Sequence, residues 1–104
     1  MKGDNMKRIA NLAQELYDEL EAAKEYAEKY LDFKASEQSQ WAGKFQEMAK
    51  DELKHAGHLH DLVVEEIEKL KKVYTPPEEM MEKWQKEHRE YIEKAAWIKQ
   101  ILQM

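Results

Sequence analysis

Apolar residues recur every three or four positions along almost the whole chain, which is the spacing of one face of an α-helix. In the first third of the chain, one such row, which we call the Leu12 row, consists of Leu12, Leu16, Glu19, Ala23, Tyr26, Tyr30 and Phe33. In the middle third, the Trp41 row consists of Trp41, Phe45, Met48, Glu52, His55, Leu59 and Leu62. With only three glycines and two prolines to interrupt such helices, the sequence predicts an all-α fold.

Two interruptions of the periodicity divide the chain into three long helices. The stretch 35–40 has no apolar periodicity and contains two serines that could cap a helix, and a proline pair follows at 76–77. No repeat or linker is recognisable, so we expect one domain over the whole chain. The expected domain and helices are residues 1–104, with helices at about 5–34, 39–73 and 76–103.

The expected helix starts rest on capping residues. Asp4 or Asn5 can accept hydrogen bonds from the free N–H groups of the first turn, so either is expected to cap the first helix. Thr75 and Glu78 have the spacing of a capping box, with Pro76 at the favoured first helical position. The third helix is therefore predicted to begin at Pro76.

Charge and cysteine content exclude several classes of function. The net charge is −5, which argues against a nucleic-acid or anionic-membrane surface. The chain has no cysteine, so disulfides, iron–sulfur clusters and thiolate zinc sites are excluded. Neither a membrane-spanning apolar run nor the apolar stretch of a signal peptide is present, so we expect a cytoplasmic protein that binds neither nucleic acid nor membrane.

Three ionisable residues occupy positions where the helical pattern calls for apolar side chains. Glu19 interrupts the Leu12 row, and Glu52 and His55 interrupt the Trp41 row. Glu52 and His55 are three positions apart, so they project from the same face of their helix. A carboxylate in an apolar row is costly to desolvate unless it is paired or binds a metal. A metal site between two helices is therefore the leading interpretation.

An interpretation without metal remains open, because the E-x-x-H pattern is common by chance in a chain rich in glutamate. Glu19 and Glu52 could lie at the edge of the apolar row and pair with lysines, in a non-catalytic helical interaction or scaffold module. His88 interrupts an apolar row of the third helix between Trp84 and Tyr91. It could be a metal ligand, a donor to a ligand, or a buried histidine bonded to a carboxylate.

The remaining candidates are assigned to other roles by their helical positions. Glu21 and Glu25 share a face with other acidic residues and are expected to form a solvated strip. His58 falls on the polar face of the middle helix and is expected to be exposed. His60 lies on a second apolar row, where a core histidine with one hydrogen-bond partner is the expected state.

The middle helix is apolar over two neighbouring rows. The second, the Ala49 row, consists of Ala49, Leu53, Ala56, His60, Val63, Ile67 and Leu70. A helix this broadly apolar must contact several neighbours, and two helices of the same chain cover only part of it. We therefore expect a homo-oligomer, most simply a two-fold dimer.

Two segments together resemble the first half of the rubrerythrin and ferritin-like superfamily. These are the run from Glu19 to Tyr26 and the run from Ala49 to His55, which contains E-x-x-H. The resemblance covers about residues 10–70 and implies a di-iron carboxylate site. It also implies a role for Tyr26, two turns after Glu19, as a hydrogen-bond donor or a quencher of oxidising equivalents near the metals.

The chain departs from the full ferritin-like pattern because it has three expected helices and a single E-x-x-H. In this respect it is similar to short ferritin-like proteins of the encapsulated-ferritin type, which build the site from two subunits. The resemblance implies that Glu19, Glu52 and His55 from each of two chains hold two metals on the dimer axis. Dimerisation would then complete a four-helix bundle. No capsule-targeting tail follows the third helix, so encapsulation is unsupported.

The expected chemistry follows from this resemblance and from the donor types. Carboxylates and imidazole suit iron, with manganese or zinc as alternatives. With iron, ferroxidase activity or peroxide reduction is expected, with oxygen or peroxide as substrate. A divalent-metal binding protein without turnover is a further alternative. Iron storage is not implied.

Overall fold

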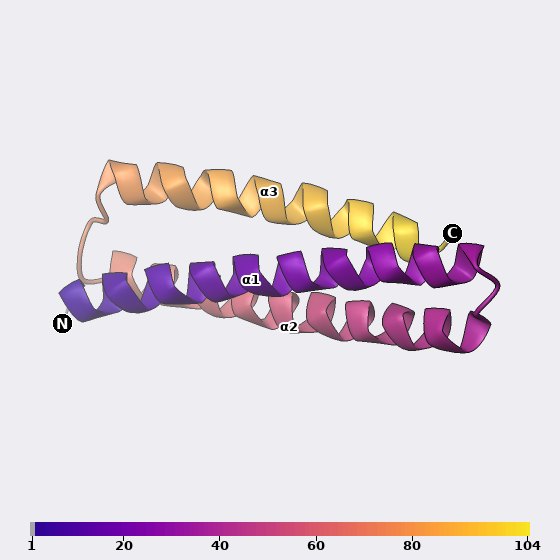
Figure 1. Ribbon diagram of the computed structural model, residues 1–104. Coiled ribbons are helices and arrows are strands. Elements are labelled where there is room, and N and C mark those ends of the chain that lie inside the picture. Colours follow the sequence, from indigo (N-terminus) through magenta and orange to yellow (C-terminus); the bar gives the residue numbers. More distant parts are fainter. Residues whose placement is uncertain (1) are drawn as a thin grey trace.

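The computed structural model describes residues 2–104 and consists of three helices. They are α1 (Lys2–Ala35), α2 (Ser39–Lys71) and α3 (Glu78–Leu102), and the described residues contain no strand. The expected all-α fold with three long helices is confirmed. Helices α1 and α2 form an antiparallel hairpin, and α3 runs back alongside it in the direction of α1 (Figure 1). The C-terminus consequently lies near the α1–α2 turn, at the opposite end from the N-terminus (Figure 1).

The turn between α1 and α2 occurs where the sequence predicts it and is closed by backbone hydrogen bonds. The Gln38 N–H donates to the Phe33 carbonyl at 2.9 Å, and the Glu37 N–H donates to the Lys34 carbonyl at 3.1 Å. This pair of bonds is the Schellman pattern, which places one residue in the left-handed region. That residue is Glu37, with φ 61°, although glycine is the usual occupant. No side-chain cap is formed at the start of α2, so the expected serine cap is wrong.

Helix α3 begins two residues later than predicted. Its first residue is Glu78, and Pro77 occupies the N-cap position with ψ 143° and no side-chain capping bond. The expected start at Pro76 and the Thr75 capping box are therefore wrong. The reason is that a residue followed by proline is driven out of the helical region, so Pro76 cannot be helical in front of Pro77. Two glutamates in the first turn, Glu78 and Glu79, favour the start instead.

Helix α1 begins earlier than predicted, at Lys2, so neither Asp4 nor Asn5 caps it. Asp4 lies within the first turn, where a carboxylate interacts favourably with the helix dipole. Aspartate is favoured both at the N-cap and within the first turn of a helix, so Asp4 did not by itself fix the start of α1. The other observed helix ends lie within two residues of those predicted.

The core is built from the Ala49 row rather than the Trp41 row. The buried residues of α2 are Ala42, Ala49, Ala56, Val63, Ile67 and Leu70. They pack against buried α1 residues that include Ala23 and Ala27, and small side chains on both helices allow close approach. In the Trp41 row, by contrast, Trp41 is 51% exposed, Met48 39% and Leu62 38%. The expectation that this row is a buried seam is wrong for the single chain.

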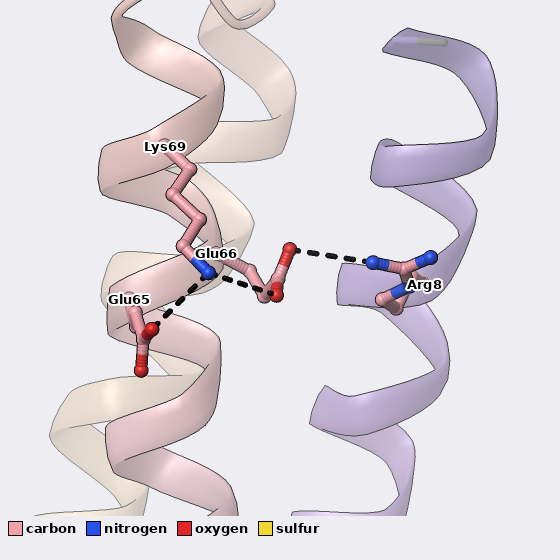
Figure 2. A network of polar contacts seen from close by, with 4 residues as sticks. All are labelled: Arg8, Glu65, Glu66 and Lys69. Carbon is pink, nitrogen blue, oxygen red and sulfur yellow. Dashed lines mark ion pairs between the residues drawn. The ribbon is translucent and has the colours of Figure 1, made fainter.

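Polar contacts tie the three helices together at several levels. Arg8 of α1 lies 3.7 Å from Glu66 of α2, and Glu66 also faces Lys69, which pairs with Glu65 (Figure 2). The Gln46 side chain of α2 donates to the carbonyl at the end of α3 at 2.6 Å.

Among residues 2–104, no helix has the length and apolar content needed to cross a membrane.

Candidate metal centre

Glu19, Glu52 and His55 meet across the α1–α2 hairpin. One possible ligand atom from each residue lies within 4.8 Å of those of the other two. His55 Nδ1 is 3.7 Å from Glu19 Oε2 and 3.7 Å from Glu52 Oε2. The antiparallel pairing of the two helices places residue 19 opposite 52–55, and the i, i+3 spacing turns Glu52 and His55 to the same side. The structure thus brings together the three residues on which the metal hypothesis depends.

The three side chains are more exposed than the sequence suggests. The exposed fraction of the side chain is 32% for Glu19, 23% for Glu52 and 55% for His55. The expected desolvation of carboxylates inside an apolar seam therefore does not apply to the single chain. The 3.7 Å separations are too long for hydrogen bonds, so the imidazole does not lock the two carboxylates in place. Their oxygens remain accessible to a cation.

The donor set fits a divalent transition metal. Two carboxylates and one imidazole match the preferences of iron, manganese and zinc, and would neutralise a doubly charged ion. Three donors are fewer than the four to six that such ions usually take, which leaves positions for water, substrate or donors from another chain. The group as it stands is therefore a partial coordination shell.

The site opens on the side of the hairpin that faces away from α3. Gln46 hydrogen-bonds α3 and the His60 ring stacks on α3 residues, so these two positions mark the α3 side of α2. At 3.6 residues per turn, His55 and Met48 lie almost opposite them around the helix. The outward face around the site consequently carries His55 together with the exposed apolar side chains of the Trp41 row.

Tyr26 lies on the same face of α1 as Glu19 but is not part of the ligand group. Its ring stacks on Phe45 of α2, with centroids 6.2 Å apart, and Phe45 also stacks on Phe33 at 5.3 Å. The tyrosine is therefore held in an aromatic cluster that lies beside the ligand group, further along the α1–α2 hairpin. Its expected role near the metals stays a prediction.

His88 lies elsewhere. Its ring stacks on His60, with centroids 4.8 Å apart, and on Trp84 at 5.8 Å, so the structure does not bring it to Glu19, Glu52 and His55. Its place on the inner face of α3 explains the interruption of the apolar row. His88 is only partly buried and no bond from it to a carboxylate is found among residues 2–104, so its contacts are ring contacts, and a ligand role stays a prediction.

The two other histidines have the environments expected from sequence. His58 is exposed. His60 is largely buried, and its Nδ1 lies 3.1 Å from Asp61 Oδ1, which gives it the single hydrogen-bond partner predicted. Because an ionised carboxylate only accepts, His60 Nδ1 carries the proton of that bond.

One acidic residue has a role that the sequence did not reveal. Glu21 was expected in a solvated strip, but it forms an ion pair with Lys94 of α3. Burial partly desolvates the Lys94 ammonium group and lowers the pKa of Lys94. The pair joins residues 73 positions apart, so no local sequence pattern could have predicted it.

Comparisons of the chain with protein-family models, with curated protein sequences and with solved structures gave no match. The donor geometry and the surface around it are therefore the observations from which a function can be argued.

Proposed function

We propose that this protein is a ferritin-like metal-binding protein, with a di-iron centre completed when two copies associate through the exposed face of the α1–α2 hairpin. The observation that carries the proposal is the convergence of Glu19, Glu52 and His55 from two helices on one point. A glutamate facing an E-x-x-H pair across a helix–helix contact is the arrangement used by di-iron carboxylate bundles.

The incomplete donor set and the exposed apolar surface support a site shared between two chains. Two copies related by a two-fold axis would contribute four carboxylates and two imidazoles, a set that suits two metal ions. Trp41, Met48 and Leu62 lie on the same face of α2 and would be covered by the partner. Two hairpins would then form a four-helix bundle, with each α3 on the outside.

In this proposal the chain supplies binding and positioning. Glu19 and Glu52 provide negative charge, His55 provides a nitrogen donor, and the partner's apolar face excludes water from the interface. Bound iron would supply the electrons for ferroxidase or peroxide-reducing chemistry with oxygen or peroxide. Tyr26, held by Phe45 beside the site, is the residue proposed to donate a hydrogen bond or quench oxidising equivalents.

A second candidate function is a helical interaction module without metal. The observation in its favour is that His55 Nδ1 is equally close to both carboxylates, so a protonated imidazole could partly neutralise them. In that case the three residues would form a small ion-pair group beside the exposed apolar row, and the partner could be a different protein.

Metal content of protein purified without chelator distinguishes the two functions. We expect about one metal ion per chain, as in a site where two chains hold two ions. Glu52→Ala and His55→Ala should lose it, whereas His58→Ala, which changes an exposed histidine of the same helix, should retain it. Full metal content in Glu52→Ala would favour the interaction module, and equal loss in the His58 and His55 variants would refute the assigned face.

Two further measurements test the shared site and the activity. Metal that binds only the associated state must stabilise that state, so sedimentation with ferrous iron should show more dimer than sedimentation with a chelator. A monomer that binds a full metal pair would contradict the shared site. Oxygen consumption on adding ferrous iron separates a ferroxidase from a metal-binding protein without turnover.

A further inference from the structure

Four rings form a continuous stack between α2 and α3, away from the candidate metal centre. The His60 ring of α2 stacks on His88 and on Tyr91 of α3, with both centroid distances 4.8 Å. His88 in turn stacks on Trp84 at 5.8 Å, and Trp84 also contacts His60 at 5.9 Å. We call these four residues the histidine–aromatic stack.

The stack is a principal contact between α3 and α2. Apart from the Gln46 hydrogen bond at the far end of α3, the hydrogen bonds, ion pairs and ring contacts found between these two helices among residues 2–104 are all made by His60. Tyr91 also reaches the α2 backbone, because its hydroxyl would lie 3.7 Å from a Cβ placed on Gly57. Beside the apolar core cluster that the two helices share, the first half of α3 is thus attached to α2 through rings that include two imidazoles.

The stack has an unmet polar group at its centre. His60 Nε2 is buried and has no hydrogen-bond partner among the described residues. With the Nδ1 proton directed to Asp61, this nitrogen carries a lone pair in the neutral ring. Protonation would convert it to a buried N–H with no acceptor, while His88 lies face to face with the same ring.

We propose that His60 and His88 form an acid-sensitive latch, in which two neutral imidazoles hold the first half of α3 on α2 and protonation of both releases it. Imidazole is the side chain that ordinarily changes charge between pH 5 and 8. Two imidazolium rings in contact repel each other, so the charge of the first protonated ring opposes protonation of the second.

The other groups that face the stack do not offset two positive charges. From α2, Asp61 accepts the His60 bond, but its side chain is 81% exposed, so water screens its attraction. From α3, Tyr91 stays neutral, because burial and the nearby Asp61 raise its pKa above the ordinary value. The π faces of Trp84 and Tyr91 favour one imidazolium. From α1, the core residues of the same cluster are apolar: Ile9, Leu16 and Leu20.

Release of α3 would expose apolar side chains that already line a groove. A groove of about 560 Å³ lies between α1 and α3, and its apolar lining includes Ile9, Leu16, Met80 and Trp84. Movement of α3 away from the hairpin would widen this groove and leave the metal centre intact, because none of the three proposed ligands lies on α3.

Hydrogen exchange of the full-length protein with chelator present tests the latch. Protection factors, which remove the intrinsic pH dependence of exchange, are measured for amides of residues 82–92 at pH 7.5 and pH 5.5. We expect a fall of at least about tenfold on acidification, as repulsion between adjacent charges would produce. Amides in the middle of α1 and α2 should keep their protection, which separates release of α3 from global unfolding.

Two variants remove the titration but keep a ring in the stack, and a third is the matched control. His60→Phe should reduce the pH effect to less than about twofold, because it removes both the buried Nε2 and the ring that repels a protonated His88. His88→Phe should reduce the effect only in part, because the repulsion is lost but protonation of His60 still creates a buried N–H without an acceptor. His58→Phe, on the exposed side of α2, should retain the full effect. Protection in the wild type that does not change with pH would overturn the proposal, as would an undiminished pH effect in either stack variant. If a stack variant does not fold, the wild-type measurement alone decides.

Discussion

Replacement of Glu52 by glutamine separates a metal ligand from a structural ion pair. The change removes one negative charge and preserves the shape of the side chain. Without metal the expected cost is small, because the His55 partner is 55% exposed and the pair is 3.7 Å apart, which is too long for a hydrogen bond. Open ion pairs of this kind contribute about 0–1 kcal/mol. The melting temperature of the metal-free protein should therefore change by only a few degrees.

With metal the expected difference is much larger. A ligand that binds only the folded state stabilises it by about 2.7 kcal/mol when its free concentration is 100 times Kd. For a chain of this length, 1 kcal/mol corresponds to about 4–8 °C in melting temperature, so the metal should raise it by roughly 10–20 °C. Glu52→Gln should lose nearly all of this increase, because one of only three donors per chain has lost its charge.

The assay is thermal unfolding followed by far-UV circular dichroism under anaerobic conditions, with either a chelator or ferrous iron. Glu47→Gln is the matched control, because Glu47 lies on the exposed face of the same helix. A full metal-induced shift in Glu52→Gln would refute the ligand role. A loss of several kcal/mol in the metal-free variant would instead identify Glu52 as part of a structural ion pair.

Three other predictions concern the fold. Glu37→Gly should raise the free energy of unfolding by about 1 kcal/mol in urea titrations, because φ 61° is strained for a residue with a Cβ; an unchanged midpoint would show that the strain is negligible. Leu70→Ala should lower the free energy of unfolding by about 2–5 kcal/mol, since Leu70 is 1% exposed, whereas Val73→Ala should lower it by less than about 0.5 kcal/mol, since Val73 is 79% exposed. Similar losses in the two variants would contradict the assignment of Leu70 to the core. Burial and Asp61 raise the pKa of Tyr91, so above pH 10 the folded state binds more protons than the unfolded state, and the free energy of unfolding should fall as the pH rises there. In an ultraviolet titration, Tyr91→Phe should remove the tyrosine ionisation that occurs at the highest pH.

The helices and the approximate turn positions were predictable because they depend on local periodicity. The convergence of Glu19, Glu52 and His55 was predictable for the same reason, since the interruptions of the apolar rows on two consecutive antiparallel helices fall at a matching level along the hairpin. Which of the two rows, the Trp41 row or the Ala49 row, faces the core of the single chain was not predictable. Both rows are apolar, and only the placement of the third helix decides which of them is covered within one chain.

The helix starts and the contacts between distant residues show where sequence reasoning failed. Thr75, Pro76 and Glu78 satisfy a capping rule, but the steric effect of the second proline on the first overrides it. The Glu21–Lys94 pair could not be predicted, because its partners lie on different helices and each has an ordinary position on its own helix.

All three proposed metal donors lie on the α1–α2 hairpin, and this has a consequence for the order of folding. The loop that brings Glu19 to Glu52 spans 33 residues, whereas the Glu21–Lys94 contact that fastens α3 closes a loop of 73. The shorter loop costs about 0.7 kcal/mol less chain entropy to close, and hairpin contacts of low sequence separation form fast. We expect the three donors of each chain to assemble before α3 docks, so that the hairpin presents its half of the shared site to a second chain before the last helix is in place.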